Sequence, residues 1–375
     1  MSTDAAAPSL PLTMRGISIS GYGPLDDAIS MKQDWPVPRP GAGELLLRVH
    51  AVALAPGDAR MQSGDARLMQ KPKAFPYIPG GDCCGVVVAV GPKQSAKHDS
   101  FAVGDRVYAT FVDPNPLGCL AEYCVVKQAL AANKPEGLSF LEASTLGSSA
   151  VTAQTVVETH VRPGDRVLVL GGTGGVGCFV VQLAKAAGAS FVAATSSQPE
   201  LVLELGADRA VDYAAEQWWD LPEFMGDENR FDVIVDLVGG KEAWKQAKRC
   251  KVVKSAWQGG RFATTTFDNP FPRMHNWFQV VWFLLPMMGR LMWTGVYKFI
   301  PAYKLTQGVV NPRNAQPKYR RLNEKFLGSE SESAPLRVVL DPAGPFPFTV
   351  EGLRAGFHLQ KSRHVKGKAV VELLA

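Results

Sequence analysis

A glycine-rich loop between an apolar strand and a helix constrains the fold of this chain more than any other feature. Residues 167–170 are continuously apolar, which is typical of a parallel strand that is covered on both faces. Gly172, Gly174 and Gly177 follow with the spacing Gly-x-Gly-x-x-Gly, and apolar residues at helical spacing come next. Strand, loop and helix in this order predict a dinucleotide-binding domain.

The loop itself is the predicted coenzyme site. Its first glycine permits a tight turn, the second lets the backbone approach a diphosphate, and the third lets helix and strand pack closely. Amide groups at the start of the helix then hold the phosphates. We therefore expect the whole loop to bind the coenzyme, through Gly172, Thr173, Gly174, Gly175, Val176 and Gly177.

The end of the following strand indicates which nicotinamide coenzyme binds. An NAD site usually carries Asp or Glu there, about 20 residues beyond the loop. Here the strand ends in Thr195, Ser196 and Ser197, whose hydroxyls can donate to a 2′-phosphate. We predict NADPH, bound in part by Ser196 and Ser197. A capping box formed by Ser197 and Glu200 is the structural alternative.

Length and patterning indicate an α/β protein with two domains. The 375 residues exceed the size of about 250–300 residues at which single cores stop growing. As far as Gly147, short apolar runs are punctuated by Pro and Gly, which predicts a β-rich domain. From Gly164 onward, strands alternate with helices, which predicts a doubly wound parallel sheet. Two more short strands are expected at 336–340 and 368–373.

Composition argues against several other classes of protein. A net charge of +5, without an arginine-rich run among aromatic residues, gives no reason to expect nucleic-acid binding. The six cysteines include no Cys-x-x-Cys pair, so we expect reduced thiols. Residues 1–13 contain no Lys or Arg and no apolar run, so they resemble neither a secretory signal nor a transit peptide, which predicts a cytoplasmic protein.

Motifs along most of the chain together resemble one family. They lie at 77–87, 103–107, 119–123, 142–153, 171–188, 205–213 and 367–371. In this combination the chain resembles the medium-chain dehydrogenase/reductase superfamily, in its zinc-free quinone-oxidoreductase branch. The resemblance implies a GroES-like catalytic domain over 14–147 that 335–375 completes. It also implies a Rossmann domain over 148–334, with an extension at 270–323.

Zinc-bearing members of this superfamily hold their catalytic metal with two cysteines and a histidine. By register, those positions are Ala55, Gly81 and Ser148 in this chain. A zinc site needs three or four Cys, His or carboxylate ligands, so we predict no metal site. The remaining chemistry is hydride delivery to an acceptor that is already electrophilic, such as a quinone or an α,β-unsaturated carbonyl.

The same resemblance assigns further site residues. Thr152 is expected near the nicotinamide and Tyr213 near the 2′-phosphate. Three residues after later strands, Val238, Gly239 and Thr264, would line the coenzyme cleft together with Lys368. In the substrate cleft the family often has Asn-Pro-x-Asp, where this chain has Ala55-Pro-Gly-Asp58. Asp58, Arg60 and Tyr77 are the candidates there, with a packing or capping role as the alternative.

The segment 270–323 departs from an ordinary Rossmann domain. From Asn269 to Asn323 there is no Asp or Glu, whereas the same span has eight Lys and Arg residues. Three interpretations stay open: a transmembrane helix, a membrane-surface patch, and a lid over the cleft or a homodimer interface. The extension resembles those of reticulon-interacting mitochondrial oxidoreductases and chloroplast-envelope quinone oxidoreductase homologues. That resemblance implies association with an organellar membrane.

Two alternatives to quinone or enone reduction also stay open. A regulatory or scaffold protein would hold NADPH without turning it over. An enoyl-thioester reductase would act on acyl thioesters and not on free quinones.

Overall fold

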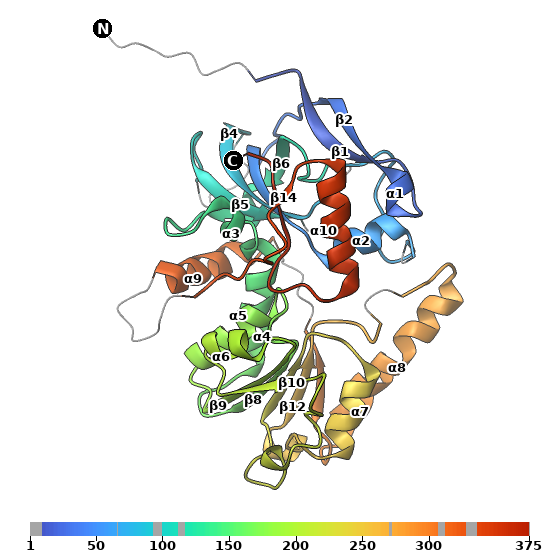
Figure 1. Cartoon of the computed structure of the whole chain (residues 1–375), viewed down its shortest axis with the longest axis vertical. Helices are drawn as coiled ribbons and strands as arrows, with labels where there is room; N and C mark the ends of the chain where they lie inside the picture. The colour runs from blue at the N-terminus through green and yellow to red at the C-terminus, as the bar shows by residue number, and fades with distance from the viewer. Residues whose placement is uncertain are drawn as a thin grey trace.

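The structure is a computed structural model that describes residues 10–65, 67–92, 100–111, 117–269, 272–306, 312–327 and 336–374. Figure 1 shows two lobes stacked along the long axis, with both chain ends in the same lobe. That lobe contains a seven-stranded sheet, and the other contains a six-stranded sheet. The β-rich domain and doubly wound domain expected from the sequence are therefore both present, which confirms the predicted fold class.

The seven-stranded sheet combines strands from both ends of the chain. β3 (Glu44–Ala53) pairs with β4 (Asp82–Val90), β6 (Tyr123–Lys127) and β15 (Val370–Glu372), all antiparallel. β5 (Arg106–Thr110), β7 (Ala131–Asn133) and β14 (Phe346–Pro347) complete it. A separate hairpin joins β1 (Thr13–Ile19) to β2 (Ile29–Pro36). The C-terminal residues thus belong to the same sheet as the N-terminal ones.

Short helices surround this sheet. They are α1 (Leu25–Ala28), α2 (Pro56–Ser63) and α3 (Phe140–Ala143), followed late in the chain by α10 (Val350–Ser362). The core beneath them is built from residues such as Leu47, Val87 and Phe357, which are 0% exposed. A strand presents successive side chains to opposite faces, so Leu45, Leu47 and Val49 of β3 all point into this core.

The six-stranded sheet is parallel throughout and has the order β10-β9-β8-β11-β12-β13. Its strands are β8 (Arg166–Leu170), β9 (Phe191–Ser196), β10 (Arg209–Asp212), β11 (Val233–Asp236), β12 (Arg261–Thr264) and β13 (Ala302–Leu305). In chain order this is 3-2-1-4-5-6, the arrangement of a Rossmann fold. The strand order reverses between β8 and β11, and ligands of such sheets bind at that point, beyond the carboxyl ends.

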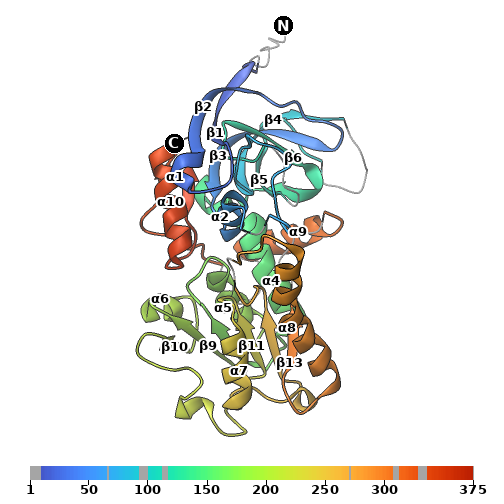
Figure 2. The same ribbon diagram turned by 90° about the vertical axis from the view of Figure 1, so that its right-hand side faces the viewer.

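Helices cover both faces of the parallel sheet (Figure 2). α5 (Gly177–Ala186) and α6 (Pro199–Glu204) pack in one hydrophobic cluster, whereas α7 (Lys241–Arg249) and α8 (Trp277–Val296) pack in another. α4 (Val151–His160) leads from the first sheet to the second, directly after a π-helical turn at Leu146–Ala150. α9 (Ala315–Leu327) returns to the first lobe, where Tyr319 stacks edge-on against Tyr108.

Two local predictions were wrong. Residues 336–339 form no strand, and only an isolated bridge joins Leu340 to Lys368. The Ser197–Glu200 capping box is absent as well, because the N-cap of α6 is Gln198 and no side chain caps it. At the start of α6, the hydroxyl of Ser196 accepts from Gln198 N at 2.7 Å instead. Of the helices in the described parts of the chain, none is long and apolar enough to cross a membrane.

Candidate active site

The glycine-rich loop lies between the end of β8 and the start of α5, at the point where the strand order reverses. Gly172 N donates to Thr195 O at 2.8 Å, and Gly174 N donates to Gly171 O at 3.1 Å, which fixes the turn. α5 then begins at Gly177. Among the described residues, the amides of Val176 and Gly177 have no backbone acceptor, whereas the parallel bridge between Gly174 and Gly367 directs the Gly175 amide toward Gly367 O. Amides of this kind at a helix start suit an anionic group.

The individual glycines of the loop serve different purposes. A Cβ on Gly177 would lie 2.0 Å from Gly171 O, and one on Gly172 would lie 2.7 Å from Ala194 Cβ. Both glycines therefore permit close packing of the protein against itself. A Cβ on Gly174 would meet only Gly171 O, at 3.4 Å. Gly174 thus leaves space that the protein does not fill, and the cradle fits a diphosphate.

Thr173 and Ser196 hold the loop against the end of β9. Their hydroxyls lie 2.9 Å apart, and Ser196 Oγ also accepts from Gln198 N at 2.7 Å. Because Ser196 is 1% exposed and its hydroxyl is already engaged, it supports the loop and is not presented to a phosphate. The direct phosphate contact expected of Ser196 therefore does not fit its position. Ser197 is exposed, as is Tyr213 just after the adjacent strand β10.

Asp236 organises the turn after β11, on the other side of the reversal point. Its Oδ1 accepts from Val238 N at 3.2 Å and from Gly239 N at 3.0 Å, and its Oδ2 accepts from Thr264 Oγ1 at 3.2 Å. Thr264 is buried and therefore orders this turn, whereas Val238 is 43% exposed at its surface. Gly239 has a φ of +83°, which few other residues adopt at low energy. Burial raises the pKa of Asp236 to about 6.

Lys368 links the glycine-rich loop to the first lobe. The preceding Gly367 N donates to Thr173 O at 2.7 Å, and the Lys368 side chain passes beneath Gly175. Its Nζ then donates to Leu54 O at 3.0 Å. Burial lowers the pKa of Lys368, while the charges of Asp82 and Asp58 raise it. The side chain thus touches the loop with its stem but directs its ammonium into the first lobe.

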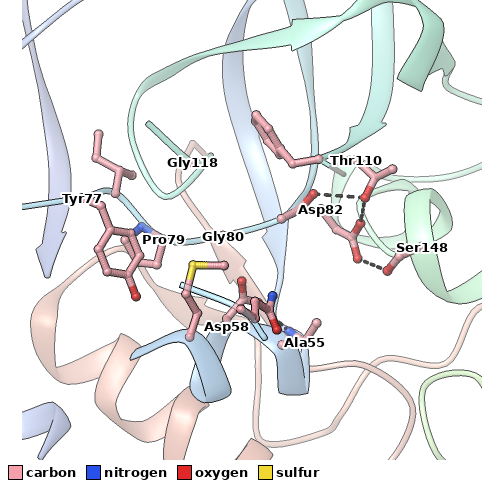
Figure 3. Close-up of a pocket in the computed structure, with 15 residues that line it drawn as sticks. Ala55, Asp58, Tyr77, Pro79, Gly80, Asp82, Thr110, Gly118 and Ser148 are labelled. Carbon is pink, nitrogen blue, oxygen red and sulfur yellow. Dashed lines mark hydrogen bonds between the residues drawn. The ribbon is translucent and has the colours of Figure 1, made fainter. Parts of the chain in front are cut away.

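A pocket of about 200 Å³ lies in the first lobe, beside that ammonium. α2 contributes Gly57, Asp58 and Met61, and the segment before β4 contributes Tyr77 to Asp82. Figure 3 shows these residues around the pocket, with Ser148 and Thr110 on the opposite side from Tyr77. Ala55, Gly81 and Ser148, the three positions where related enzymes carry zinc ligands, all line it. These three positions, which the sequence matches to zinc ligands, thus lie around one cavity.

A carboxyl–hydroxyl network forms one wall of the pocket. Asp82 accepts a short hydrogen bond from Ser148 Oγ at Oδ2 and another from Thr110 Oγ1 at Oδ1, 2.6 Å away. Burial raises the pKa of Asp82, against the opposing effects of Lys368 and the two hydroxyls. This network was not among the sites predicted from the sequence. The signal for it was Asp82 itself, an ionisable residue at the start of an otherwise apolar strand.

Asp58 forms the floor of the pocket at the first turn of α2. Its Oδ2 accepts from Ala55 N at 2.9 Å, which caps the helix. The residue borders the cavity and is only partly covered, but its carboxyl is deep in the lobe, and desolvation raises its pKa to about 6. Neighbouring Asp82 raises that pKa further, whereas Lys368 lowers it. Asp58 can therefore hold or release a proton near neutral pH.

The other sequence candidates fall into two groups. Tyr77 lines the pocket, is 1% exposed, and its hydroxyl has no protein partner in the described residues. Desolvation raises the pKa of Tyr77, so the hydroxyl keeps its proton. Arg60, on the same helix as Asp58, is not among the described pocket-lining residues, and burial lowers its pKa. Thr152 is 8% exposed in α4, one turn beyond Ser148.

The donor set of the pocket is poor in metal ligands. Among the described residues, no group of three or more His, Cys, Asp or Glu side chains is arranged to hold a metal ion. The six cysteines are unpaired, and five of them are buried. The absence of zinc stays a prediction, which elemental analysis can test.

The two lobes match two family descriptions. Residues 41–136 match "Alcohol dehydrogenase GroES-like domain", and residues 175–265 match "Zinc-binding dehydrogenase". Together with the fold and the site, these matches define an oxidoreductase of the alcohol-dehydrogenase type.

Similar proteins indicate which branch of this class the chain belongs to. The chain is 33% identical over 372 residues to the chloroplastic NADPH-dependent alkenal/one oxidoreductase of Arabidopsis thaliana, covering 97% of this chain and 80% of the relative. It is 38% identical over 368 residues to the 2-methylene-furan-3-one reductase of Solanum lycopersicum, with the same coverage of both. The quinone oxidoreductase of Coxiella burnetii superposes with a TM-score of 0.70 at 25% identity, over 96% of this chain and 99% of that one. The chain belongs to the medium-chain dehydrogenase/reductase superfamily, in its quinone-oxidoreductase branch.

Proposed function

We propose that this protein is an NADPH-dependent reductase of a quinone or an α,β-unsaturated carbonyl compound. The observation that carries the proposal is the connection between an anion-binding loop and a polar pocket through Gly367 and Lys368. Relatives named as an NADPH-dependent alkenal/one oxidoreductase and a 2-methylene-furan-3-one reductase support this class of acceptor. When bound, the coenzyme supplies a hydride, and the protein supplies orientation and protons.

Different residues of the second lobe bind different parts of the coenzyme. The amides of Val176 and Gly177 hold the diphosphate, over the space left by Gly174. Exposed Ser197 and Tyr213 at adjacent strand ends meet the 2′-phosphate, with no carboxylate at the end of β9 to repel it. Thr152 and the turn at Val238 and Gly239 flank the nicotinamide.

The residues of the pocket act on the acceptor. Tyr77 donates its unpartnered hydroxyl to the carbonyl oxygen, where negative charge develops during reduction. Asp58, with a pKa of about 6, supplies the proton that the reduced acceptor takes up. The hydroxyl of Ser148, held by Asp82, shapes the opposite wall where zinc enzymes place a metal ligand.

A panel of acceptors tests this function. Purified protein with NADPH is assayed against quinones, enones and enoyl thioesters by the loss of NADPH absorbance. Turnover of quinones or enones is expected. Turnover of acyl thioesters alone would identify a thioester reductase, and tight NADPH binding without any turnover would identify a scaffold or regulatory protein. Either outcome would overturn the proposal.

The partners and location of the protein are proposals of the same kind. The Arabidopsis relative is named chloroplastic, which favours an organellar location for this chain over the cytoplasmic one predicted from residues 1–13. We also propose that the segment 270–323 contacts a membrane surface. A homodimer is the competing use of that segment.

A further inference from the structure

Helix α8 is apolar on two opposite faces. Its inner face buries Val280 and Met287 against the parallel-sheet lobe and the loop after α2. Its outer face exposes nine large apolar side chains, each between 54% and 74% exposed: Trp277, Phe278, Val281, Trp282, Leu285, Met288, Met292, Trp293 and Val296. A helix that is apolar all round is normally covered on every side. The outer face therefore fits a partner that is not part of this lobe.

The exposed area is large for a protein that stays free in water. With about 200 Å² for each aromatic side chain, the three tryptophans and Phe278 alone expose roughly 500 Å². That equals the largest apolar patch of a typical monomer, about 300–600 Å², before the five aliphatic residues are added. Figure 2 shows α8 along the outer edge of the lobe, so this face is open to a broad partner.

Exposed cations lie at both ends of α8 and on the neighbouring helix α7. Arg273 precedes α8 and Lys298 follows it, and both are exposed. α7, which packs in the same hydrophobic cluster, exposes Lys241, Lys245, Lys248 and Arg249. Its one acid, Glu242, pairs with Lys245 at 3.1 Å, and Asp268 pairs with Arg290 on the side of α8. The surroundings of the apolar face are therefore cationic.

This charge distinguishes between the two candidate occupants. In a symmetric dimer built on α8, the same surface of both copies would meet, so the cations of one would face those of the other. An anionic lipid surface instead offers acyl chains to the apolar residues and negative headgroups to the cations. Tryptophan is also the residue that best suits the membrane–water interface. The observations therefore favour lipid.

The residues just before α8 contact the loop that leads to the acceptor pocket. Met274 N donates to Asp65 O at 2.6 Å, and Leu68 packs against Met274 and Val280. Asp65 and Leu68 belong to the loop that follows α2 and leads to Gln70, which lines the pocket. A membrane in contact with α8 would thus lie close to the entrance of the pocket.

We propose that the outer face of α8 lies in the surface of an anionic membrane, with the helix axis in the membrane plane, and that lipophilic acceptors reach the pocket from there. Lipid binding stands on the surface of α8 alone. The delivery of the acceptor rests on the function proposed above.

Two leucine variants test the lipid contact. Leu285 is 54% exposed on the outer face of α8, and Leu203 is 48% exposed on α6, which packs against the opposite face of the sheet. In flotation with vesicles of phosphatidylcholine plus phosphatidylserine, the wild type is expected to bind and Leu203→Glu to match it. Leu285→Glu is expected to partition roughly tenfold less, a loss of about 1.4 kcal/mol. Vesicles of phosphatidylcholine alone should bind all three proteins more weakly.

Turnover separates this inference from the proposed function. With a water-soluble acceptor, all three proteins should be equally active, since neither leucine lies at the pocket. With a lipophilic quinone, vesicles should stimulate the wild type and Leu203→Glu but not Leu285→Glu. Failure of every acceptor would reject the proposed function and leave the vesicle result standing. Equal vesicle binding by Leu285→Glu, or a wild-type dimer that this substitution dissociates in the absence of lipid binding, would overturn the membrane contact.

Discussion

The amide of Gly367 donates to the carbonyl oxygen of Thr173 at 2.7 Å, which joins the C-terminal segment to the coenzyme loop. The next residue along, Lys368, extends its side chain from beneath that loop to Leu54 in the other lobe. Two segments that are almost 200 residues apart in the sequence thus meet at one point. This short connection joins the coenzyme loop to the backbone next to Ala55, which lines the acceptor pocket.

Removal of the Tyr77 hydroxyl should lower turnover without lowering the stability of the fold. Tyr77→Phe removes a buried hydroxyl that has no protein partner, so the free energy of unfolding should stay the same or rise. Turnover should fall roughly 10–100-fold, because a hydrogen bond to developing charge contributes about 1.5–3 kcal/mol. Steady-state kinetics and urea unfolding measure the two effects. Unchanged kcat and KM would show that Tyr77 does not contact the acceptor.

Asp58 should make the free energy of unfolding depend on pH. Its pKa rises from 3.8 to about 6 on folding, so the folded state binds more protons between these pH values. The stabilisation is therefore present below about pH 4 and is lost as the pH rises through 6. In Asp58→Asn this loss should be absent, which makes the variant relatively more stable at pH 7 by on the order of 1–3 kcal/mol. Parallel urea titrations across this range provide the comparison.

The same group should control turnover if it is the acid of the reaction. In the wild type, kcat for an enone should decline above about pH 6, where Asp58 loses its proton. A profile that Asp58→Asn leaves unaltered would assign the proton to water or to another group.

The exposed end of β9 should determine coenzyme preference. Ser197→Asp places a carboxylate where the 2′-phosphate is proposed to bind, and a carboxylate can instead accept from the 2′-hydroxyl of NADH. The ratio of NADPH to NADH affinity should fall at least tenfold, or about 1.4 kcal/mol. Calorimetric titration of both coenzymes gives the ratio. An identical ratio in the variant would show that the 2′-phosphate does not bind at Ser197.

The side chains at the three positions that match zinc ligands of related enzymes predict a protein without bound zinc. Ala55 and Gly81 offer no donor atom, and the hydroxyl of Ser148 is bound to Asp82. Elemental analysis of protein purified without chelators should find far less than one zinc per chain. One tightly held zinc per chain would show that other residues bind the metal.

Much of the fold could be predicted because it depends on local patterns. The run 167–170, the glycine spacing and the alternation after Gly164 each specify their own backbone, so the parallel sheet and its coenzyme loop followed from them. Asp58 and Tyr77, two of the three substrate-cleft candidates, line one cavity, whereas Arg60 is not among its described lining residues.

The rest depends on contacts between distant segments, which no local pattern specifies. Asp82 meets Ser148 and Thr110 only after β4, β5 and the π-helical turn have packed together. The burial of Ser196 and the direction of the Lys368 ammonium are set in the same way, by neighbours far along the chain. For the segment that contains α8, the apolar pattern left a transmembrane helix, a membrane-surface patch and a lid or homodimer interface open. It did not indicate a helix with only one of its apolar faces covered.

Gly174→Val tests most directly whether the amides at the start of α5 capture the diphosphate. The new side chain would enter space that the protein leaves empty, whereas Gly177→Ala would meet Gly171 O at 2.0 Å and destabilise the fold. Titration of NADPH into the folded Gly174→Val variant, with its thermal unfolding as a control, should reveal no measurable binding at an unchanged melting temperature. Wild-type affinity for NADPH in that variant would contradict the account.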